Sequence, residues 1–429
     1  MKTRATARVV ATAAVLLLGA SACTTSNYEG GARDTLTILT HYANDPLKSG
    51  LQEMVDEWNA ANPDLQVETQ AVSFDELLQT ITVRQTGGEA PDIVHAYSLW
   101  GGQLAEANVL AEVPEDVAQD VRDNYSPAAV GSVTVDDRIV GYPTEVQTYG
   151  LYYNKRLLAE AGYDAPPSSW EELEEIAAAT TKRDDSGNIE VAGFGLTSGW
   201  DSAVVHPWVS LLQSAGGRYM NEDGTATAFD SPEGRAALEL EKRMIDDGVA
   251  DPAIDVLKSF PSGTTAMTIN AGWWIGSLKT TMGDDYEDIG VAEIPGPEVG
   301  DTGSMAYGYF AGVNSRSERQ DDAWEFLKWL NGEKGDNGAT RMGSFQFSLG
   351  TIPGRMADSE ALAGTIDDPN FDPFVAALEY AAPEPNGRNG QEMKSSLQGS
   401  IEAVWTGQQT VEEALAAAAA AADAALSEG

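Results

Sequence analysis

The sequence has almost no cysteine and very little histidine. Of its 429 residues only Cys23 is a cysteine, so no disulfide can form within the chain. The three histidines, His41, His95 and His206, are far apart in the sequence, and no Cys/His cluster has the spacing of a zinc site. We therefore expect neither a metal site nor a cofactor.

Signatures of common catalytic sites are also missing. The chain contains no GxSxG, no phosphate-binding GxxxxGK[ST] and no HExxH. A carboxylate pair of the kind that glycosidases use cannot be picked out among 67 acidic residues. We expect a protein that is not an enzyme and has no catalytic residue. A secreted hydrolase that acts on polysaccharide is the alternative from a different class.

Basic residues are few. The chain has 26 lysines and arginines against 67 acidic residues, which gives a formal net charge of −41. A surface this negative repels phosphate backbones, so nucleic acid is not expected as a partner. No apolar run reaches the length of about 18 residues that a transmembrane helix needs.

The amino terminus has the pattern of a secretory signal peptide. MKTRATAR is basic, VVATAAVLLLGA is apolar, and small residues precede Cys23. The segment resembles the lipobox of bacterial lipoproteins, in which the cysteine is lipidated; an ordinary signal peptide that contains a cysteine is the alternative. We predict a signal peptide over 1–22, a lipidated tether over 23–33, and anchoring at the extracytoplasmic face of the cell membrane.

Strands and helices alternate along the rest of the chain. The segments 35–40 (TLTILT), 65–72 and 92–96 (DIVHA) are typical of short buried strands, and residues with helical spacing separate them. One of these helices begins with a capping box over 73–76 (SFDE). The alternation predicts parallel βαβ units and an α/β fold. The length favours two lobes.

Aromatic residues follow several predicted strands, where ligands bind in α/β folds. A flat ring beside polar side chains suits a sugar, because the ring covers the C–H face while polar groups bind the hydroxyls. In SGTTAMTINAGWW (262–274) a strand leads directly to Trp273 and Trp274. Neighbouring residues of an extended chain face opposite ways, so we assign Trp273 to the ligand and Trp274 to packing. For each aromatic residue, a place in the core is the alternative.

Five segments in a fixed order resemble the family 1 extracellular solute-binding proteins of ABC importers, the family that includes maltose-binding protein. They cover nearly the whole mature chain: GGEAPDIVHAYSLWGGQLAEANVLAEV, GYPTEVQTYGLYYNKRLL with AGYDAPPSSWEEL, SGTTAMTINAGWW, FAGVNSRSERQDDAWEFLKWL and GQQTVEEAL.

The resemblance implies a type II periplasmic-binding-protein fold. Two α/β lobes would be joined by a hinge, with the ligand in the cleft between them, and a permease would read the closed form. The chain would first cross between the lobes at 143–147, again near 304–308, and a third time near 353–366. The expected bounds are 34–142 with 308–360 for lobe one, and 148–303 with 365–429 for lobe two.

Ligand contacts are implied in the same way. Gln147 falls where maltose-binding protein has a sugar-contacting carboxylate, and Trp273 falls on the family's stacking tryptophan. The other predicted ligand-binding residues lie in loops at strand ends or, for one of them, just before a strand: His41, Asn44, Tyr97, Trp100, Trp200, Asp201 and Tyr307.

The last part of the chain departs from the family pattern. Lys394 and Ser395 stand where maltose-binding protein has a Trp-Tyr pair, and Gln398 stands in place of its arginine. This departure argues against maltose itself as the ligand.

The sequence thus predicts a monomeric lipoprotein that captures a sugar or oligosaccharide and delivers it to the permease subunits of an ABC importer. The alternative is the same scaffold with a polyol, a sugar phosphate or an osmolyte as its ligand. Arg355 and Arg388 are the residues that would meet an anion, although surface charge is the simpler interpretation of both.

Overall fold

The computed structural model describes residues 35–363 and 368–427. The predicted signal peptide (1–22), the lipidation site Cys23 and the tether (23–33) lie outside the described residues. Among the helices that the structure describes, none combines the length and the apolar character that crossing a membrane requires.

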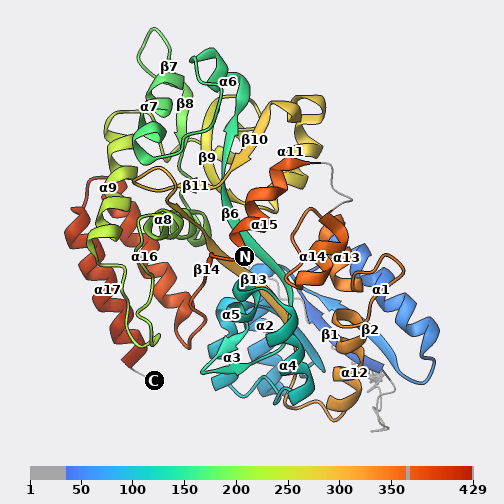
Figure 1. The fold of residues 1–429 in the computed structure, drawn as a ribbon. Helices are drawn as coiled ribbons and strands as arrows, with labels where there is room; N and C mark the ends of the chain where they lie inside the picture. Colours follow the sequence, from blue (N-terminus) through green and yellow to red (C-terminus); the bar gives the residue numbers. More distant parts are fainter. Residues whose placement is uncertain (1–34, 364–367, 428–429) are drawn as a thin grey trace, which may run out of the picture. The chain divides into compact units, whose positions relative to one another are not determined.

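The described chain alternates between strands and helices, as predicted (Figure 1). The strands are β1 Thr35–Thr40, β2 Gln66–Ala71, β3 Ile93–Tyr97, β4 Thr134–Val135, β5 Arg138–Ile139, β6 Tyr142–Asn154, β7 Lys182–Arg183, β8 Ile189–Gly195, β9 Thr265–Ala271, β10 Ile289–Ala292, β11 Ile294–Pro295, β12 Thr302–Gly303, β13 Met305–Val313 and β14 Ala382–Pro383. The helices are α1 Leu47–Ala61, α2 Phe74–Gly87, α3 Gly101–Glu106, α4 Glu115–Asn124, α5 Pro127–Ser132, α6 Lys155–Glu160, α7 Trp170–Thr180, α8 Asp201–Ser214, α9 Pro232–Asp246, α10 Val256–Ser259, α11 Trp274–Met282, α12 Gln320–Asn331, α13 Arg341–Ser348, α14 Met356–Ala363, α15 Asp372–Ala377, α16 Gly390–Trp405 and α17 Val411–Ser427.

The main sheet has the strand order β2-β1-β3-β13-β6-β9-β8-β7. The predicted parallel pairing is confirmed for β1 with β2 and β3, and for β8 with β9. It is wrong for the middle of the sheet, because β13 runs antiparallel to both β3 and β6, and β6 runs antiparallel to β9. The expectation of parallel units throughout missed these two long returning strands.

Strand β6 reaches both parts of the sheet. Its first half pairs with β13 and its second half pairs with β9 and β10 (Figure 1). Pro143, which has no N–H to donate, lies in this central strand where the register with β13 shifts between Tyr309 and Phe310. Such an irregularity lets a sheet accept a proline away from its edge.

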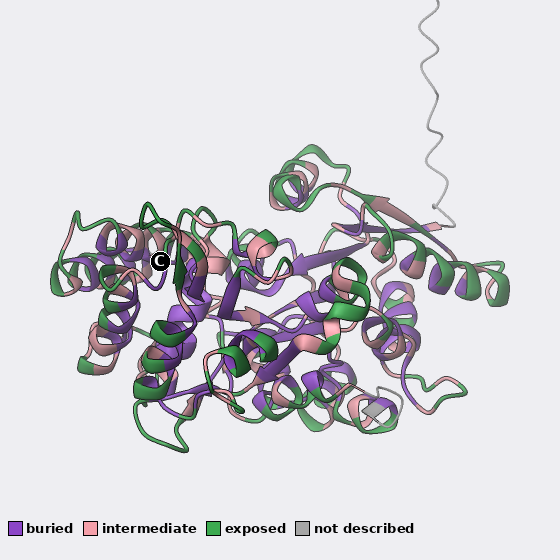
Figure 2. Ribbon diagram, turned by 90° about the horizontal axis from the view of Figure 1, so that it is seen from above, coloured by how far each residue is buried: buried purple, intermediate pink, exposed green. Residues whose placement is uncertain are grey.

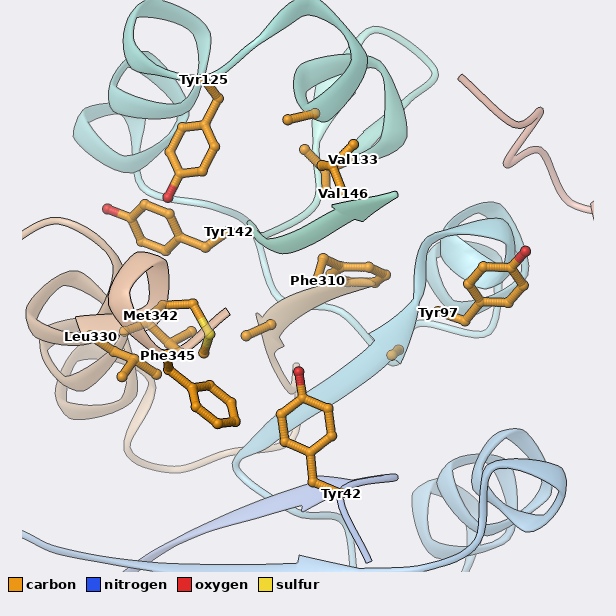
Figure 3. Close-up of a cluster of buried hydrophobic side chains, with 14 of the residues drawn as sticks. Tyr42, Tyr97, Tyr125, Val133, Tyr142, Val146, Phe310, Leu330, Met342 and Phe345 are labelled. Atoms are coloured by element: carbon orange, nitrogen blue, oxygen red, sulfur yellow. The ribbon is translucent and has the colours of Figure 1, made fainter. Parts of the chain in front are cut away.

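Buried side chains form two hydrophobic clusters. The first surrounds β1, β3 and α12, and Figure 3 shows part of it around Phe310, with Tyr125 and Tyr142 beside it and Tyr42 below. The second surrounds β8, α8, α9, α16 and α17 and contains Trp208. The central strands β3, β6 and β9 are buried along almost their whole lengths, whereas most outer helices bury one side only (Figure 2). In α1 that side is the predicted stripe at helical spacing: Leu51, Met54, Val55 and Trp58.

The close contact between β8 and α7 allows a test of the packing. A Cβ atom on Gly193 would lie 1.9 Å from the backbone oxygen of Ala177, which cannot move without shifting the helix. Gly193→Ala should therefore lower the free energy of unfolding by about 1–3 kcal/mol, measured by urea denaturation.

The matched control is Gly399→Ala. Gly399 is exposed on α16 and has no atom within 4 Å of the added Cβ. That substitution should stabilise the protein by up to about 1 kcal/mol, because alanine is the better helix former. Equal effects of the two substitutions would contradict the packing described for β8.

Candidate ligand-binding site

Two adjoining pockets open where the two hydrophobic clusters meet. The first has a volume of about 650 Å³ and the second about 760 Å³, both within the range of small-molecule sites. Three aromatic residues, Trp273, Tyr307 and Tyr309, line both pockets. Trp273 and Tyr307 also pack against both hydrophobic clusters, which places them at the junction.

Trp273 reaches this junction because β9 ends at Ala271 and α11 begins at Trp274. Its backbone N–H donates to Oε1 of Gln147 at 3.0 Å. Trp274 is buried and packs edge-on against Tyr152, with ring centroids 5.2 Å apart. The predicted division between a pocket residue and a packing residue agrees with these positions. The premise of an extended chain at this point was wrong. Trp273 has helical backbone angles (φ −54°, ψ −25°), and the two residues lie at the start of a helix.

Gln147 and Tyr307 face each other across neighbouring strands. They are register partners on β6 and β13. Gln147 is buried and lines the second pocket, where its amide holds the Trp273 backbone in place. Both predicted residues therefore lie on the pocket walls.

Trp200 and Asp201 lie at the start of α8 and line the first pocket. Trp200 is 41% exposed, which is unusual for a side chain of its size. Asp201 accepts a hydrogen bond from Nε2 of Gln391 at 2.6 Å, and its Oδ1 lies 3.6 Å from Nζ of Lys394. Its carboxylate is thus held at the pocket wall by α16.

The remaining predicted residues are placed differently. Tyr97, at the end of β3, lines the first pocket. His41, Asn44 and Trp100 line neither pocket. His41 stacks on Tyr309 at 4.4 Å, Asn44 is exposed, and Trp100 is buried. Ligand contact stays a prediction for all nine residues, and the geometry argues against direct contact for these three.

Lys394 belongs to a buried polar network beneath the first pocket. Its Nζ lies 2.8 Å from a carboxylate oxygen of Glu384 and donates to Tyr97 at 2.9 Å and to Ser202 at 2.7 Å. Nε2 of His206 lies 2.6 Å from Glu384. Lys394 stands where the family pattern has an aromatic residue. Its side chain points into the protein interior and binds other protein groups.

The charges in this network follow from burial and from its partners. Burial disfavours the Glu384 carboxylate, but Lys394 and His206 outweigh it and lower the pKa of Glu384 to about 2. Burial, followed by repulsion from Lys394, lowers the pKa of His206. A neutral His206 with its proton on Nε2 donates to Glu384 and accepts from the Tyr149 hydroxyl, which lies 2.8 Å from Nδ1. The network thus contains one buried ion pair, between Lys394 and Glu384.

All charged residues that line the two described pockets are acidic. Asp75 and Asp201 line the first pocket, and Glu145 lines the second. Burial raises the pKa of Glu145 to about 7, with a hydrogen bond to Tyr42 opposing the shift. Anionic ligands would meet only like charge here.

Arg355 and Arg388 do not supply the missing positive charge, because neither lines these pockets. Arg355 is buried, pairs with Asp120 and donates to the backbone oxygen of Asn331 at 3.0 Å, so its interpretation as surface charge was wrong. Arg388 forms a surface ion pair with Glu106 at 2.6 Å. Among the described residues, no group of three or more His, Asp and Glu side chains is placed to hold a metal ion.

Sequence reasoning missed several pocket residues. Phe74 and Asp75 were assigned only to a helix cap, and that assignment was itself partly wrong, because the Ser73 hydroxyl donates to Glu76 at 2.9 Å and caps no backbone N–H. Their signal was an aromatic residue next to an aspartate directly after a predicted strand. Glu145 and Gln391 had no such signal, since their approach to the pockets depends on contacts between distant parts of the chain.

Comparison with known proteins bears on what the pockets do. The model of the family described as bacterial extracellular solute-binding protein matches residues 44–337. The maltotriose-binding protein of Pyrococcus abyssi is 24% identical over 369 residues, which cover 82% of this chain and 74% of that protein. The diacetylchitobiose-binding protein of Streptomyces coelicolor is 24% identical over 376 residues, with coverages of 83% and 79%.

Solved structures show the same arrangement of elements. The cyclic alpha-maltosyl-1,6-maltose binding protein of Arthrobacter globiformis is 26% identical, with a TM-score of 0.77 over 92% of this chain and 99% of that chain. The GacH receptor of Streptomyces glaucescens, solved unliganded and with acarbose, is 23% identical, with a TM-score of 0.76 over 92% and 98%. These likenesses confirm the predicted two-lobe α/β fold.

Proposed function

The chain belongs to the bacterial extracellular solute-binding protein family, and we propose that it captures an uncharged sugar or oligosaccharide in the two adjoining pockets. The observation that carries this proposal is the lining: aromatic rings at the junction, carboxylates and amides beside them, and no basic side chain among the described lining residues. The rings suit the C–H faces of a sugar, and the polar groups suit its hydroxyls.

The lining residues also favour an uncharged sugar over the alternative ligands. A sugar phosphate would meet Asp75 and Asp201 in the first pocket and no basic lining residue in either pocket, because Lys394, 3.6 Å from Asp201, lies beneath the pocket and pairs with Glu384. A small polyol or osmolyte would leave most of the aromatic surface uncovered. The relatives include binding proteins for maltotriose, diacetylchitobiose and a cyclic maltosyl sugar, which supports a carbohydrate of more than one unit.

Membership of an extracellular family places the chain on the extracytoplasmic side. We further propose that it is a monomeric lipoprotein tethered through Cys23, and that it hands its ligand to the permease subunits of an ABC importer. The proposed lobes keep the bounds predicted from the sequence. In support, β6 and β13 extend through the middle of the sheet. Strand β13 lines both pockets through Tyr307, and β6 lines the first through Tyr149 and the second through Gln147.

Thermal unfolding in the presence of candidate ligands tests the proposal. The panel would contain neutral monosaccharides and oligosaccharides, polyols, sugar phosphates and uronic acids. A ligand at about 100 times its Kd stabilises the folded protein by about 2.7 kcal/mol, which gives a clear rise in the unfolding midpoint. We expect that rise with a neutral oligosaccharide.

Two other outcomes would count against the proposal. A rise only with sugar phosphates or uronic acids would contradict the assignment of an uncharged ligand. Release of shorter sugars from a bound oligosaccharide, detected by product analysis, would favour the hydrolase alternative.

A further inference from the structure

Phe74 is an exposed aromatic residue that the predicted contacts do not include. It is the first residue of α2, it is 39% exposed, and it lines the first pocket. Of the large apolar side chains that the described chain leaves exposed, only Phe74 and Trp200 line this pocket. Exposed apolar surface concentrated at one site marks a place where something binds.

The ring of Phe74 is held from behind. It stacks on the indole of Trp100, with centroids 5.2 Å apart and an interplanar angle of 22°. Trp100 is buried, and its Nε1 donates to Oε1 of Gln391 at 3.3 Å. Gln391 in turn donates to Asp201 at 2.6 Å. A stacked and anchored ring that remains exposed presents its uncovered surface to the pocket in a fixed orientation.

Phe74 and Trp200 both lie at the start of a helix, Phe74 as the first residue of α2 and Trp200 as the residue just before α8. Each is followed by an aspartate, Asp75 or Asp201, at the first turn of α2 or α8, and all four residues line the first pocket. Each pair therefore offers an apolar ring and a neighbouring hydroxyl acceptor, the two features that one sugar unit needs.

We propose that Phe74, positioned by Trp100, is a second sugar-stacking surface, which receives the carbohydrate unit that lies in the first pocket, with Asp75 as a hydroxyl acceptor. Trp273 stacks on another sugar unit at the junction with the second pocket, so the ligand contains at least two sugar units. This inference rests on the proposed function, since it assigns a residue to the same carbohydrate site.

The test measures the affinity of the purified protein for the neutral oligosaccharide that gives the largest thermal shift, by isothermal titration calorimetry. Phe74→Ala should weaken binding about tenfold, as expected for the loss of one aromatic contact. Phe74→Trp should keep nearly wild-type affinity. The matched control is Val83→Ala, on the same helix, where Val83 is 59% exposed and lines neither pocket; it should change nothing.

A double-mutant cycle tests the role of Trp100 as a positioning residue. Trp100→Leu should weaken binding in the wild type but have little further effect in Phe74→Ala, because the two residues act as a unit. Purely additive effects would overturn this role. Unchanged affinity in Phe74→Ala, with Trp273→Ala still losing binding, would overturn the stacking role alone. Absence of carbohydrate binding by the wild-type protein would overturn the proposed function as well.

Discussion

Replacing Trp273 with alanine is expected to weaken carbohydrate binding about 100-fold while leaving the fold intact, as removal of a central aromatic contact does at binding hot spots. Trp273 lines both pockets, so its loss affects the ligand on both sides of the junction. Its side chain is only partly buried, and the position of its backbone depends on Gln147 rather than on the indole. Calorimetric titration of the variant checks the affinity, and circular dichroism checks the fold.

Trp274→Ala is the matched control from the neighbouring position. Trp274 is buried among Tyr152 and Phe260, so its truncation should destabilise the protein by about 3–5 kcal/mol. Near the middle of its stable temperature range, the folded variant should still bind the sugar. An exchange of the two phenotypes, with binding lost at Trp274 and stability lost at Trp273, would contradict the assignment of the pair.

Lys394→Met is expected to lower the free energy of unfolding by about 3–5 kcal/mol, because it leaves the Glu384 carboxylate buried without its cation. The ammonium group of Lys394 lies 2.8 Å from that carboxylate, and both side chains are almost fully buried. Chemical denaturation at pH 8 measures the loss. Adding Glu384→Gln in the same chain should recover part of it, since the double variant buries no unpaired charge.

The destabilisation caused by Lys394→Met should depend on pH, and the protonation of His206 decides at which pH it is larger. Without Lys394, the repulsion that lowers the pKa of His206 disappears while the attraction of Glu384 remains. Burial still lowers the pKa of His206 in the variant, but this pKa should rise relative to the wild type, so the variant protonates His206 at a pH where the wild type does not. The imidazolium is then a substitute cation that reduces the loss at low pH and disappears as the pH rises through that pKa. Lys394→Met should therefore be less destabilising at pH 5.5 than at pH 8. Wild-type stability of this variant at both pH values would contradict the buried ion pair.

The contribution of Glu384 to the stability of the wild-type protein also depends on pH. The folded-state pKa of Glu384, about 2, lies below the value of about 4.3 for an unfolded glutamate. Its contribution to stability is therefore present above pH 4.3 and is lost as the pH falls toward 2.

Local patterns in the sequence predicted the parts of the fold that local forces decide. Apolar runs located β1, β3 and β9, and helical spacing located α1, because the same residues that form these elements also bury them. The antiparallel middle of the sheet escaped prediction, since pairing of β6 with β13 joins residues far apart in the chain. The register shift that lets Pro143 lie in a central strand likewise depends on the pairing with β13.

The residues of the candidate site also fall into two groups: those that a local sequence pattern indicates, and those that reach the site through the packing of distant segments. Trp273, Trp200 and Tyr97 could be predicted from the sequence because each lies at, or shortly after, the carboxyl end of a strand. Glu145 could not be found from the pattern, because its approach to the second pocket depends on how distant strands and helices pack. Lys394 was noted only as a departure from the family pattern, and its partners Glu384 and His206 come from separate parts of the chain.

A crystal structure of the protein with its best-binding neutral oligosaccharide tests the central claim most directly. The account predicts a sugar ring lying on the indole of Trp273, with further units in the first pocket beside Phe74 and hydroxyls on Asp75, Asp201 or Gln147. An oligosaccharide bound elsewhere on the chain, with the Trp273 ring uncovered, would contradict it.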